Sequence, residues 1–289
     1  MRGLLAIHAY RFLSINQFAK ASDLKPSFVR DLLRDYERRH VLGSIGNVGI
    51  KGVGKTPKLY YLTRKGYGVL LEASGLRDDE LGAFVPAHTN TRWSPAMYHR
   101  MATVDLMLAM ESSLSVTSHL RLVDSRIEYR RVKRGRGVVP ETSDFVALPE
   151  AAGNRIVPDA AFVFEKTLTG ARALFFLETD MGTERITRGT KTGYSIIDKM
   201  RQYERYLTGG RFADTYRVWG DFKFFTLLFV TNSPERVQNI RRAVSALDPK
   251  LHAYFQLTTF ESVQNDFLGA NWYSRDPRSA APSSIVRGT

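Results

Sequence analysis

The sequence predicts an α/β protein, α+β overall, in which a small helical domain precedes a larger domain built on a mixed sheet. In residues 1–75, three stretches with helical spacing precede two short apolar runs. In residues 98–274, helical and strand-like stretches alternate in the order α-β-β-β-α-β-α-β, which is typical of a mixed sheet with helices on its faces. Residues 76–97 mix charge, Pro and Gly and are expected to form a linker, and residues 275–289 are expected to be a disordered tail.

Composition and charge exclude some classes of function and favour a nucleic-acid partner. The absence of cysteine excludes disulfides, thiolate metal sites and cysteine nucleophiles. No apolar run approaches the roughly 20 residues of a membrane span, and the N-terminus lacks the features of a signal peptide. We therefore expect a cytoplasmic protein with no membrane partner. The 42 basic and 29 acidic residues give a net charge of +13, which favours a nucleic-acid partner.

Each element of the N-terminal domain has a local signal. Apolar residues recur with helical spacing from Gly3 to Leu13, and Ser14 is a suitable N-cap for a short second helix. Pro26 suits the first turn of a third helix. The apolar stripe of that third helix consists of Phe28, Val29, Leu32, Leu33 and Tyr36. Two strand-like runs follow at 41–46 and 58–62, and Thr63 can cap a fourth helix.

Three helices, a hairpin and a basic third helix outline a winged helix-turn-helix, which would bind double-stranded DNA. The third helix is expected in the major groove and the hairpin, or wing, along the phosphates. The predicted DNA-binding residues are Lys25, Ser27, Arg30, Arg34 and Arg38 on the helix and Lys51, Lys55 and Lys58 on the wing. The alternative is a winged helix that contacts only protein. Because winged-helix proteins often dimerise on DNA, a homodimer is also expected.

Residues 49–56, GIKGVGKT, match the phosphate-loop pattern G-x-x-x-x-G-K-[ST]. A phosphate loop needs a buried strand before it and a long helix that starts at its GK[ST]. Here Pro57 and the strand-like residues 58–62 follow instead. The pattern therefore favours a hairpin turn over a nucleotide site. A nucleotide-driven motor that pairs this stretch with LFFLE (174–178) fails because the helix is missing.

The second domain is expected to contain eight main elements. They are a helix at 98–114, strands at 119–132, 155–166 and 171–182, a helix at 194–207, a strand at 222–232, a helix at 233–247 and a strand near 252–260. A polar, glycine-containing excursion is expected at 133–154.

Three carboxylates suggest chemistry in this domain. Asp159 follows Pro158 in one strand, and Glu178 and Asp180 lie two residues apart in the next, so both should project from the same face. Buried carboxylates are costly unless they are paired or bound to a metal. Converging carboxylates suit Mg²⁺ or Mn²⁺, and in a basic protein the natural reaction is metal-assisted cleavage of a phosphodiester.

The arrangement PD…(D/E)-x-K on an αβββαβ core resembles the PD-(D/E)xK nucleases. With a winged helix in front, the chain from residue 1 to about residue 260 is similar to the replication-relaxation family, to which MobC-type relaxases are related. The resemblance implies that Asp159 and Glu178 bind the metal and that other mobilisation or replication proteins are partners. Asp180 stands where these nucleases usually have lysine.

A substitute cation lies on the helix at 194–207. Lys199 lies on the flank of that helix with Gln202 and Tyr206, which match the Q-x-x-x-Y element of some nucleases of the superfamily. The alternative is that Lys199 is a solvated surface lysine. Glu128 is a further candidate acid, although a surface ion pair is the more ordinary role; His99 and Glu111 are more often structural or solvated.

The leading hypothesis is a metal-dependent DNA endonuclease or nickase of a plasmid or integrative mobile element. The second is a non-catalytic DNA-binding factor for replication, partition or transcription with a degenerate nuclease fold. None of the six histidines lies two residues from another, so the His-hydrophobe-His metal cluster of tyrosine relaxases is excluded.

Overall fold

The computed structural model describes residues 1–50, 54–82, 84–87, 93–94, 96–134, 137–147, 152–187 and 194–286. The chain forms two compact units, Met1–Leu108 with Tyr129–Arg131, and Ala109–Glu128 with Val132–Thr289. The division falls within helix α6 (Ala96–Ser115), later than the linker expected at 76–97. None of the helices in the described part of the chain combines the length and apolar character that a membrane span requires.

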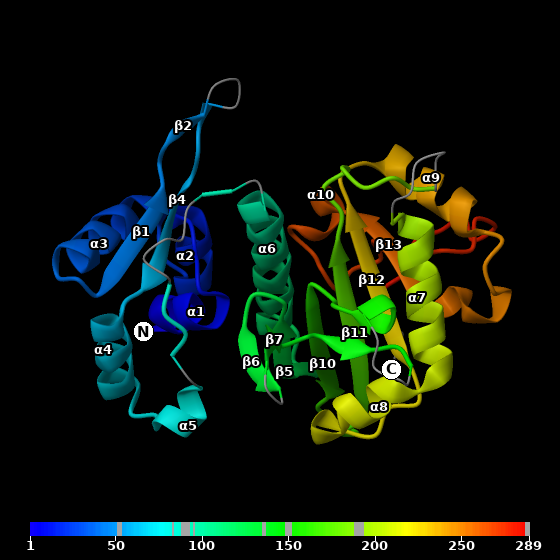
Figure 1. The fold of residues 1–289 in the computed structure, drawn as a ribbon, viewed down its shortest axis with the longest axis horizontal. Helices are drawn as coiled ribbons and strands as arrows, with labels where there is room; N and C mark the ends of the chain where they lie inside the picture. Colours follow the sequence, from blue (N-terminus) through cyan, green and yellow to red (C-terminus); the bar gives the residue numbers. More distant parts are fainter. Residues whose placement is uncertain are drawn as a thin grey trace. The chain divides into compact units, whose positions relative to one another are not determined.

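The first unit has the expected element order (Figure 1). Its elements are helices α1 (Arg2–Tyr10), α2 (Ile15–Ser22) and α3 (Pro26–Arg38), the antiparallel strands β1 (Leu42–Gly46) and β4 (Lys58–Leu62), and helices α4 (Arg64–Ser74) and α5 (Asp78–Leu81). Ser14 forms a capping box with Gln17 at the start of α2, and Thr63 caps α4 by accepting a hydrogen bond from Gly66 N. Gly66 is required because a Cβ there would lie 2.0 Å from the carbonyl oxygen of Val41.

The stretch that matches the phosphate loop is a β-hairpin. Strands β2 (Gly49–Ile50) and β3 (Gly54–Lys55) pair antiparallel, with Gly49 opposite Lys55. Gly54 has φ +90°, which favours glycine. Thr56 and Pro57 connect β3 to strand β4, so the helix that a phosphate loop requires is replaced by a strand. Lys51 lies outside the described residues.

Helix α3 differs from its expected packing at one position. Val29 and Leu33 are fully buried, as the apolar stripe predicts. Phe28 was expected in the same stripe, but its residue is 59% exposed. The prediction for Phe28 is wrong because successive helical residues are about 100° apart, so that only the centre of the stripe faces the core.

The second unit is built on a six-stranded mixed sheet, as the sequence predicts. Its strand order is β14-β13-β12-β11-β10-β5. The bounds are β5 (Leu120–Ile127), β10 (Ala160–Lys166), β11 (Arg172–Thr179), β12 (Phe225–Thr231), β13 (Phe255–Thr259) and β14 (Tyr273–Ser274). Strands β11, β12 and β13 are mutually parallel, whereas β5, β10 and β14 each run antiparallel to their neighbours.

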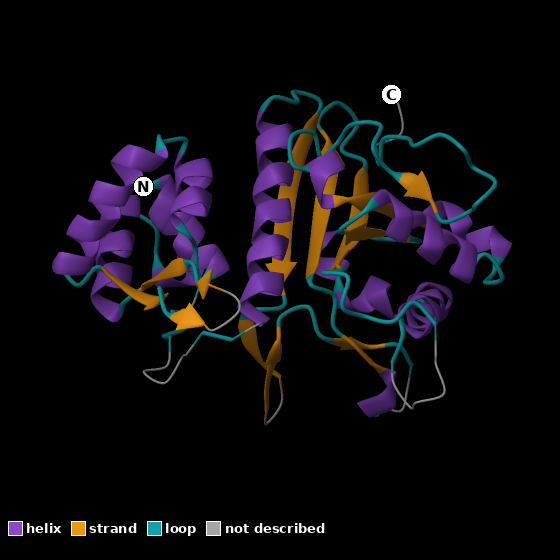
Figure 2. Cartoon of the chain, turned by 90° about the horizontal axis from the view of Figure 1, so that it is seen from above, coloured by secondary structure: helices purple, strands orange, loops and turns teal. Residues whose placement is uncertain are grey.

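Helices cover both faces of this sheet (Figure 2). The part of α6 from Ala109 onward lies over one face, and α7 (Ile196–Gly209) and α9 (Pro234–Val244) lie over the other. The core beneath α7 and α9 is rich in aromatic rings, and Phe176 lies 4.6 Å from Phe225 between ring centroids. This core holds the end of β11 in place beside α7, which is where the candidate site lies.

Short elements occupy the remaining segments. They are β6 (Arg131–Arg134), β7 (Gly137–Pro140), β8 (Asp144–Phe145), the 3-10 turn Ala152–Asn154, β9 (Arg155–Ile156), α8 (Arg211–Thr215), the 3-10 turns Arg217–Trp219 and Pro249–Tyr254, and α10 (Phe260–Val263). The excursion at 133–154 therefore contains a β6–β7 pair and strand β8, which pairs with β9.

The C-terminal segment differs from the expected disordered tail over the residues that the structure describes. Arg275 is fully buried, and its guanidinium donates to Glu204 Oε1 at 2.5 Å and to Asp248 O at 2.8 Å. Trp272 forms an antiparallel bridge with Ser283. The Ser- and Pro-rich composition predicts disorder, but these tertiary contacts hold the segment against the sheet.

Candidate active site

The register of β10 and β11 brings Asp159 and Glu178 together. Ala160 lies opposite Leu177, so Asp159, just before β10, lies next to Glu178 near the end of β11. Asp159 N donates to Leu177 O at 3.1 Å, and Thr179 N donates to Asp159 Oδ2 at 2.7 Å. Both acids are buried, at 5% and 4% exposure. Two carboxylates that the sequence selected are therefore neighbours in a site that largely excludes water.

Lys199 of α7 supplies a cation to this pair. Its Nζ lies 3.0 Å from Glu178 Oε2 and 3.1 Å from Glu184 Oε1. Its side chain is only 18% exposed, which excludes the alternative of a solvated surface lysine. Burial opposes the charge on Lys199, but the neighbouring carboxylates outweigh it and raise the pKa of the lysine above its usual value. The lysine is therefore held protonated beside Glu178.

Glu178 also accepts a hydrogen bond from Tyr203 Oη, at 2.5 Å. Burial raises the pKa of the Glu178 carboxyl to about 7, with Lys199 opposing the rise and Asp159 adding to it. Burial and the adjacent Glu178 raise the pKa of Tyr203 well above its usual value, so the phenol stays a donor. Each oxygen of Glu178 thus has one partner in the protein and keeps a lone pair for another.

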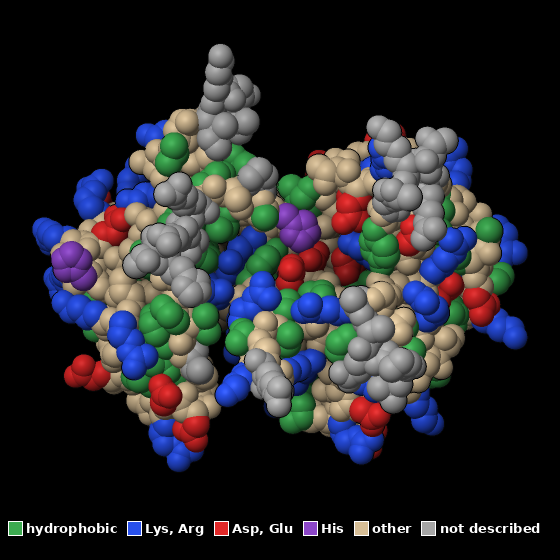
Figure 3. Space-filling view, viewed as in Figure 1, with side chains coloured by type: hydrophobic (Ala, Val, Ile, Leu, Met, Phe, Trp, Pro, Cys, Tyr) green, Lys and Arg blue, Asp and Glu red, His purple; other side chains and the backbone are tan. Residues whose placement is uncertain are grey.

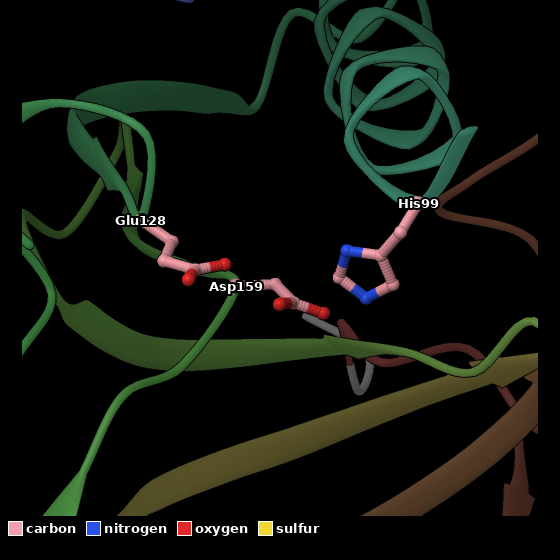
Figure 4. Close-up of side chains that lie close together, drawn as sticks. All are labelled: His99, Glu128 and Asp159. Carbon is pink, nitrogen blue, oxygen red and sulfur yellow. The ribbon is translucent and has the colours of Figure 1, made fainter. Parts of the chain in front are cut away.

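Glu128 stands close to Asp159. Glu128 N donates to Asp159 O at 2.9 Å, and a carboxylate oxygen of Glu128 lies within 4.8 Å of one from Asp159. Figure 4 shows both side chains; His99, drawn with them, comes from helix α6. Glu128 therefore lies beside a buried acid.

Asp180, a predicted metal ligand, forms its hydrogen bonds with residues outside the Asp159–Glu178 pair. Arg236 of α9 binds it through Nε at 2.5 Å and Nη2 at 3.1 Å. Thr231 Oγ1 also donates to Asp180, at 2.7 Å. Asp180 was expected to join Asp159 and Glu178 as a metal ligand. In the structure a bidentate guanidinium and a hydroxyl already bind both of its oxygens, so a metal ion would compete with these partners.

Tyr206 likewise points to other partners. It is fully buried, and its hydroxyl donates to Asp144 Oδ2, which also accepts from Thr215 Oγ1 at 2.6 Å. Tyr206 was expected with Lys199 on the flank of α7, and the structure instead buries it against Asp144. Tyr203, one turn nearer the N-terminus of α7, is the tyrosine that contacts Glu178.

Gln202 lines a cleft next to the acids. The cleft has a volume of about 410 Å³ and is lined by Gly153, Arg155, Ile156, Val157, Glu178, Tyr194, Lys199, Gln202 and Tyr203. Gln202 Nε2 donates to Arg155 O at 2.7 Å, and its Oε1 accepts from the hydroxyl of Tyr194. Gln202 therefore ties the segment before α7 to strand β9.

The predicted DNA-binding residues of the first unit lie on exposed surface. Lys25, Ser27, Arg30, Arg34 and Arg38 are all exposed on or next to α3, and Lys55 is exposed on β3. Figure 3 shows Lys and Arg side chains, with some acidic ones, on the surface of this unit. Arg34 pairs with Asp31 and Arg38 with Asp35, whereas Lys58 pairs with Glu37 at 2.6 Å. Exposed pairs contribute little, so these arginines can exchange their partners for phosphates.

Four residues of the site have no motif in the sequence that indicates their role. Tyr203 belongs to the apolar face of α7, which by itself indicates only burial. Glu184, Tyr194 and Arg236 lie in segments without a motif, and their roles depend on contacts across the sheet. The sequence holds one signal for Arg236. Asp180 is an acid expected to be buried where these nucleases usually have lysine, and such an acid needs a cation from another element.

The comparisons with known proteins agree with the resemblance found in the sequence. A family model described as replication-relaxation matches residues 4–221, which is most of the chain. No curated protein and no solved structure matches it. The family suggests a role in replication or mobilisation. With three quarters of its length matched, the chain belongs to the replication-relaxation family.

Proposed function

We propose that this protein binds DNA and that its second unit cleaves a phosphodiester with the help of a divalent metal ion, as a nickase acting in replication or mobilisation. The observation that carries the proposal is the juxtaposition of Asp159, Glu178 and Lys199 in one buried centre. Two carboxylates and a lysine are the groups that metal-assisted phosphodiester cleavage uses.

The donor set fits Mg²⁺ or Mn²⁺. Glu178 lies next to Asp159 in the sheet, and Glu128 lies beside Asp159; all three offer carboxylate oxygens, which are the ligands that these hard cations prefer. Burial and the nearby Asp159 together raise the pKa of Glu178 further than Lys199 lowers it, so the negative charge of the two buried acids is only partly compensated. A bound metal ion would neutralise this charge and polarise a phosphate oxygen.

The residues of the chain have separable tasks in this proposal. Thr179 N fixes Asp159 Oδ2, and Tyr203 Oη fixes Glu178 Oε1, so both carboxylates are oriented before a substrate arrives. Lys199 stays protonated and can stabilise negative charge that develops on the phosphate or on the attacking oxygen. In this proposal the lysine acts from helix α7. The position after β11 that usually holds the lysine is occupied by Asp180.

DNA binding is assigned to the first unit by its exposed cations. Lys25 and Arg30 have no acidic partner among the residues that the structure describes, and Lys55 lies on the exposed hairpin beyond β1. Together they form a surface that phosphates can approach without breaking an ion pair. Binding through such cations should weaken steeply as salt is added.

The test is nicking of a supercoiled plasmid that carries the cognate origin. We expect wild type to convert it to the open circle with Mg²⁺ or Mn²⁺ and to fail with a chelator. Asp159→Ala and Glu178→Ala should lose this activity, whereas Glu235→Ala, an exposed acid of the same unit, should keep it. The isosteric variants Asp159→Asn and Glu178→Gln, with matched melting curves, separate lost chemistry from lost folding. DNA binding by wild type without nicking in any metal would refute the nickase and support a non-catalytic DNA-binding factor.

A further inference from the structure

An exposed aromatic ring stands at the cleft beside the acid–lysine centre. Tyr194 lies two residues before α7 and is 57% exposed, although the other tyrosine of the cleft, Tyr203, is fully buried. The same cleft is lined by Glu178 and Lys199. Its volume of about 410 Å³ lies in the range of sites that hold small organic groups.

The ring is held in one orientation. Its hydroxyl donates to Gln202 Oε1, and Gln202 Nε2 donates to Arg155 O at 2.7 Å. Gln202 is itself 8% exposed on α7, so the hydrogen bond anchors the edge of the ring to a rigid helix. Burial raises the pKa of Tyr194 to about 12, and the phenol therefore remains a neutral donor. The tether leaves the exposed part of the ring available to a planar partner.

A planar cation also lines this cleft, the guanidinium of Arg155. Arg155 is exposed, and its Nε donates to Ser143 Oγ at 2.9 Å. No acidic residue in the described part of the chain pairs with it. Its outer N–H groups are therefore available to a phosphate. The cleft thus combines an aromatic ring, a guanidinium and the catalytic centre, which correspond to a base, a phosphate and a scissile bond.

We propose that this cleft is a nucleotide subsite in which Tyr194 stacks on an unpaired base next to the scissile phosphate and Arg155 holds the neighbouring phosphate. The inference rests on the proposed function, because it assumes that the occupant is DNA. Bases in a duplex are already stacked on both faces, so a base must leave the helix to reach Tyr194. The substrate class is therefore DNA that is single-stranded or melted at the cleavage site.

The test is binding of a fluorescent single-stranded 20-mer and its duplex, measured by anisotropy without metal so that no cleavage occurs. We expect Tyr194→Ala to weaken single-strand binding about 10-fold and to leave duplex binding within about 2-fold. Tyr194→Phe keeps the stacking face and should stay within about 3-fold of wild type. Phe224→Ala removes an exposed aromatic ring of the same unit outside the cleft and is the matched control.

The outcomes separate this inference from the proposed function. Wild type that binds neither DNA form would refute DNA binding itself. Equal single-strand binding by Tyr194→Ala and wild type would refute the stacking subsite and leave the proposed function untouched. A loss of single-strand binding in Tyr194→Phe as large as in Tyr194→Ala would assign the effect to the hydroxyl and overturn the stacking role. Arg155→Ala should reduce the salt dependence of single-strand binding by about one phosphate contact.

Discussion

Lys199 Nζ lies 3.0 Å from Glu178 Oε2 and 3.1 Å from Glu184 Oε1, so one cation of α7 serves a buried acid and a partly exposed one. The side chain of Glu178 is 5% exposed and that of Glu184 is 40% exposed. The contact to Glu184 gives the lysine a second acidic partner that is more exposed than Glu178. If a metal ion binds Glu178, the lysine can keep its charge compensated by Glu184.

Replacing Lys199 should show how far the buried acids lower the free energy of unfolding when they lack a cation. We expect Lys199→Met to abolish nicking and to lower the free energy of unfolding by about 3 kcal/mol at pH 8, because Glu178 loses its cation. A raised carboxyl pKa means that the folded state holds a proton that the unfolded state releases. Stability of the variant should therefore rise as the pH falls toward 6, by up to about 1.4 kcal/mol for each pH unit.

The measurement is urea unfolding of the metal-free protein at pH 6 and pH 8. Lys223→Met, an exposed lysine of the same unit, is the control and should follow wild type at both pH values, including the pH dependence that a Glu178 pKa of about 7 already produces. Equal destabilisation of Lys199→Met relative to wild type at both pH values would show that Lys199 does not lower the pKa of Glu178.

Asp180 and Arg236 should behave as a structural pair. We expect Asp180→Leu and Arg236→Met each to cost about 3 kcal/mol, since either change leaves a partly buried charge without its partner. The double variant should cost less than the sum of the two. Urea unfolding of the four proteins gives the coupling.

Metal binding provides the second readout for Asp180. Asp180→Asn should keep the Mn²⁺ affinity of wild type in calorimetric titration, whereas Asp159→Asn should lose it. A parallel loss of affinity in Asp180→Asn would restore Asp180 as a metal ligand.

The two tyrosines of α7 should separate into different roles. Tyr203→Phe removes the donor to Glu178, so the carboxylate is less stabilised and we expect Mn²⁺ to bind 3- to 10-fold more weakly, an order-of-magnitude figure for one hydrogen bond to a charge. Tyr206→Phe removes a donor to Asp144 and should leave Mn²⁺ affinity unchanged while lowering stability by about 1 kcal/mol. Calorimetry and thermal melts of both variants check this, and equal effects on Mn²⁺ affinity would contradict the assignment.

The hairpin should contribute a phosphate contact. Lys55→Ala is expected to weaken duplex binding and to reduce the slope of log K against log salt by about 0.9. Lys58 already pairs with Glu37, so Lys58→Ala should have the smaller effect. Fluorescence anisotropy between 50 and 200 mM salt, on the order used for such slopes, measures both, with Lys250→Ala of the second unit as the control. An unchanged slope in Lys55→Ala would remove the hairpin from the interface.

Local sequence signals located nearly every main element. Ser14, Pro26 and Thr63 begin the helices that they predict, because capping and the restricted φ of proline depend only on neighbouring residues. The same holds for the apolar runs of β10 to β12, which are buried as their composition indicates, except at Ala173. The composition of the C-terminal segment predicts disorder and gives no sign that Arg275 is buried, because that burial depends on Glu204 and Asp248 far along the chain.

The sequence by itself determined that this is a basic α/β protein of the replication-relaxation family, with Asp159 and Glu178 in adjacent strands and a lysine on the following helix. Only the tertiary structure decided which side chains meet. The period of a strand places Glu178 and Asp180 on one face, but Arg236 of α9 takes up Asp180. The period of a helix groups Lys199 with Gln202 and Tyr206, but packing on β11 turns Tyr203 to Glu178 and buries Tyr206 against Asp144. Periodicity gives the direction of a side chain from its own backbone, whereas its partner is set by whichever element packs opposite.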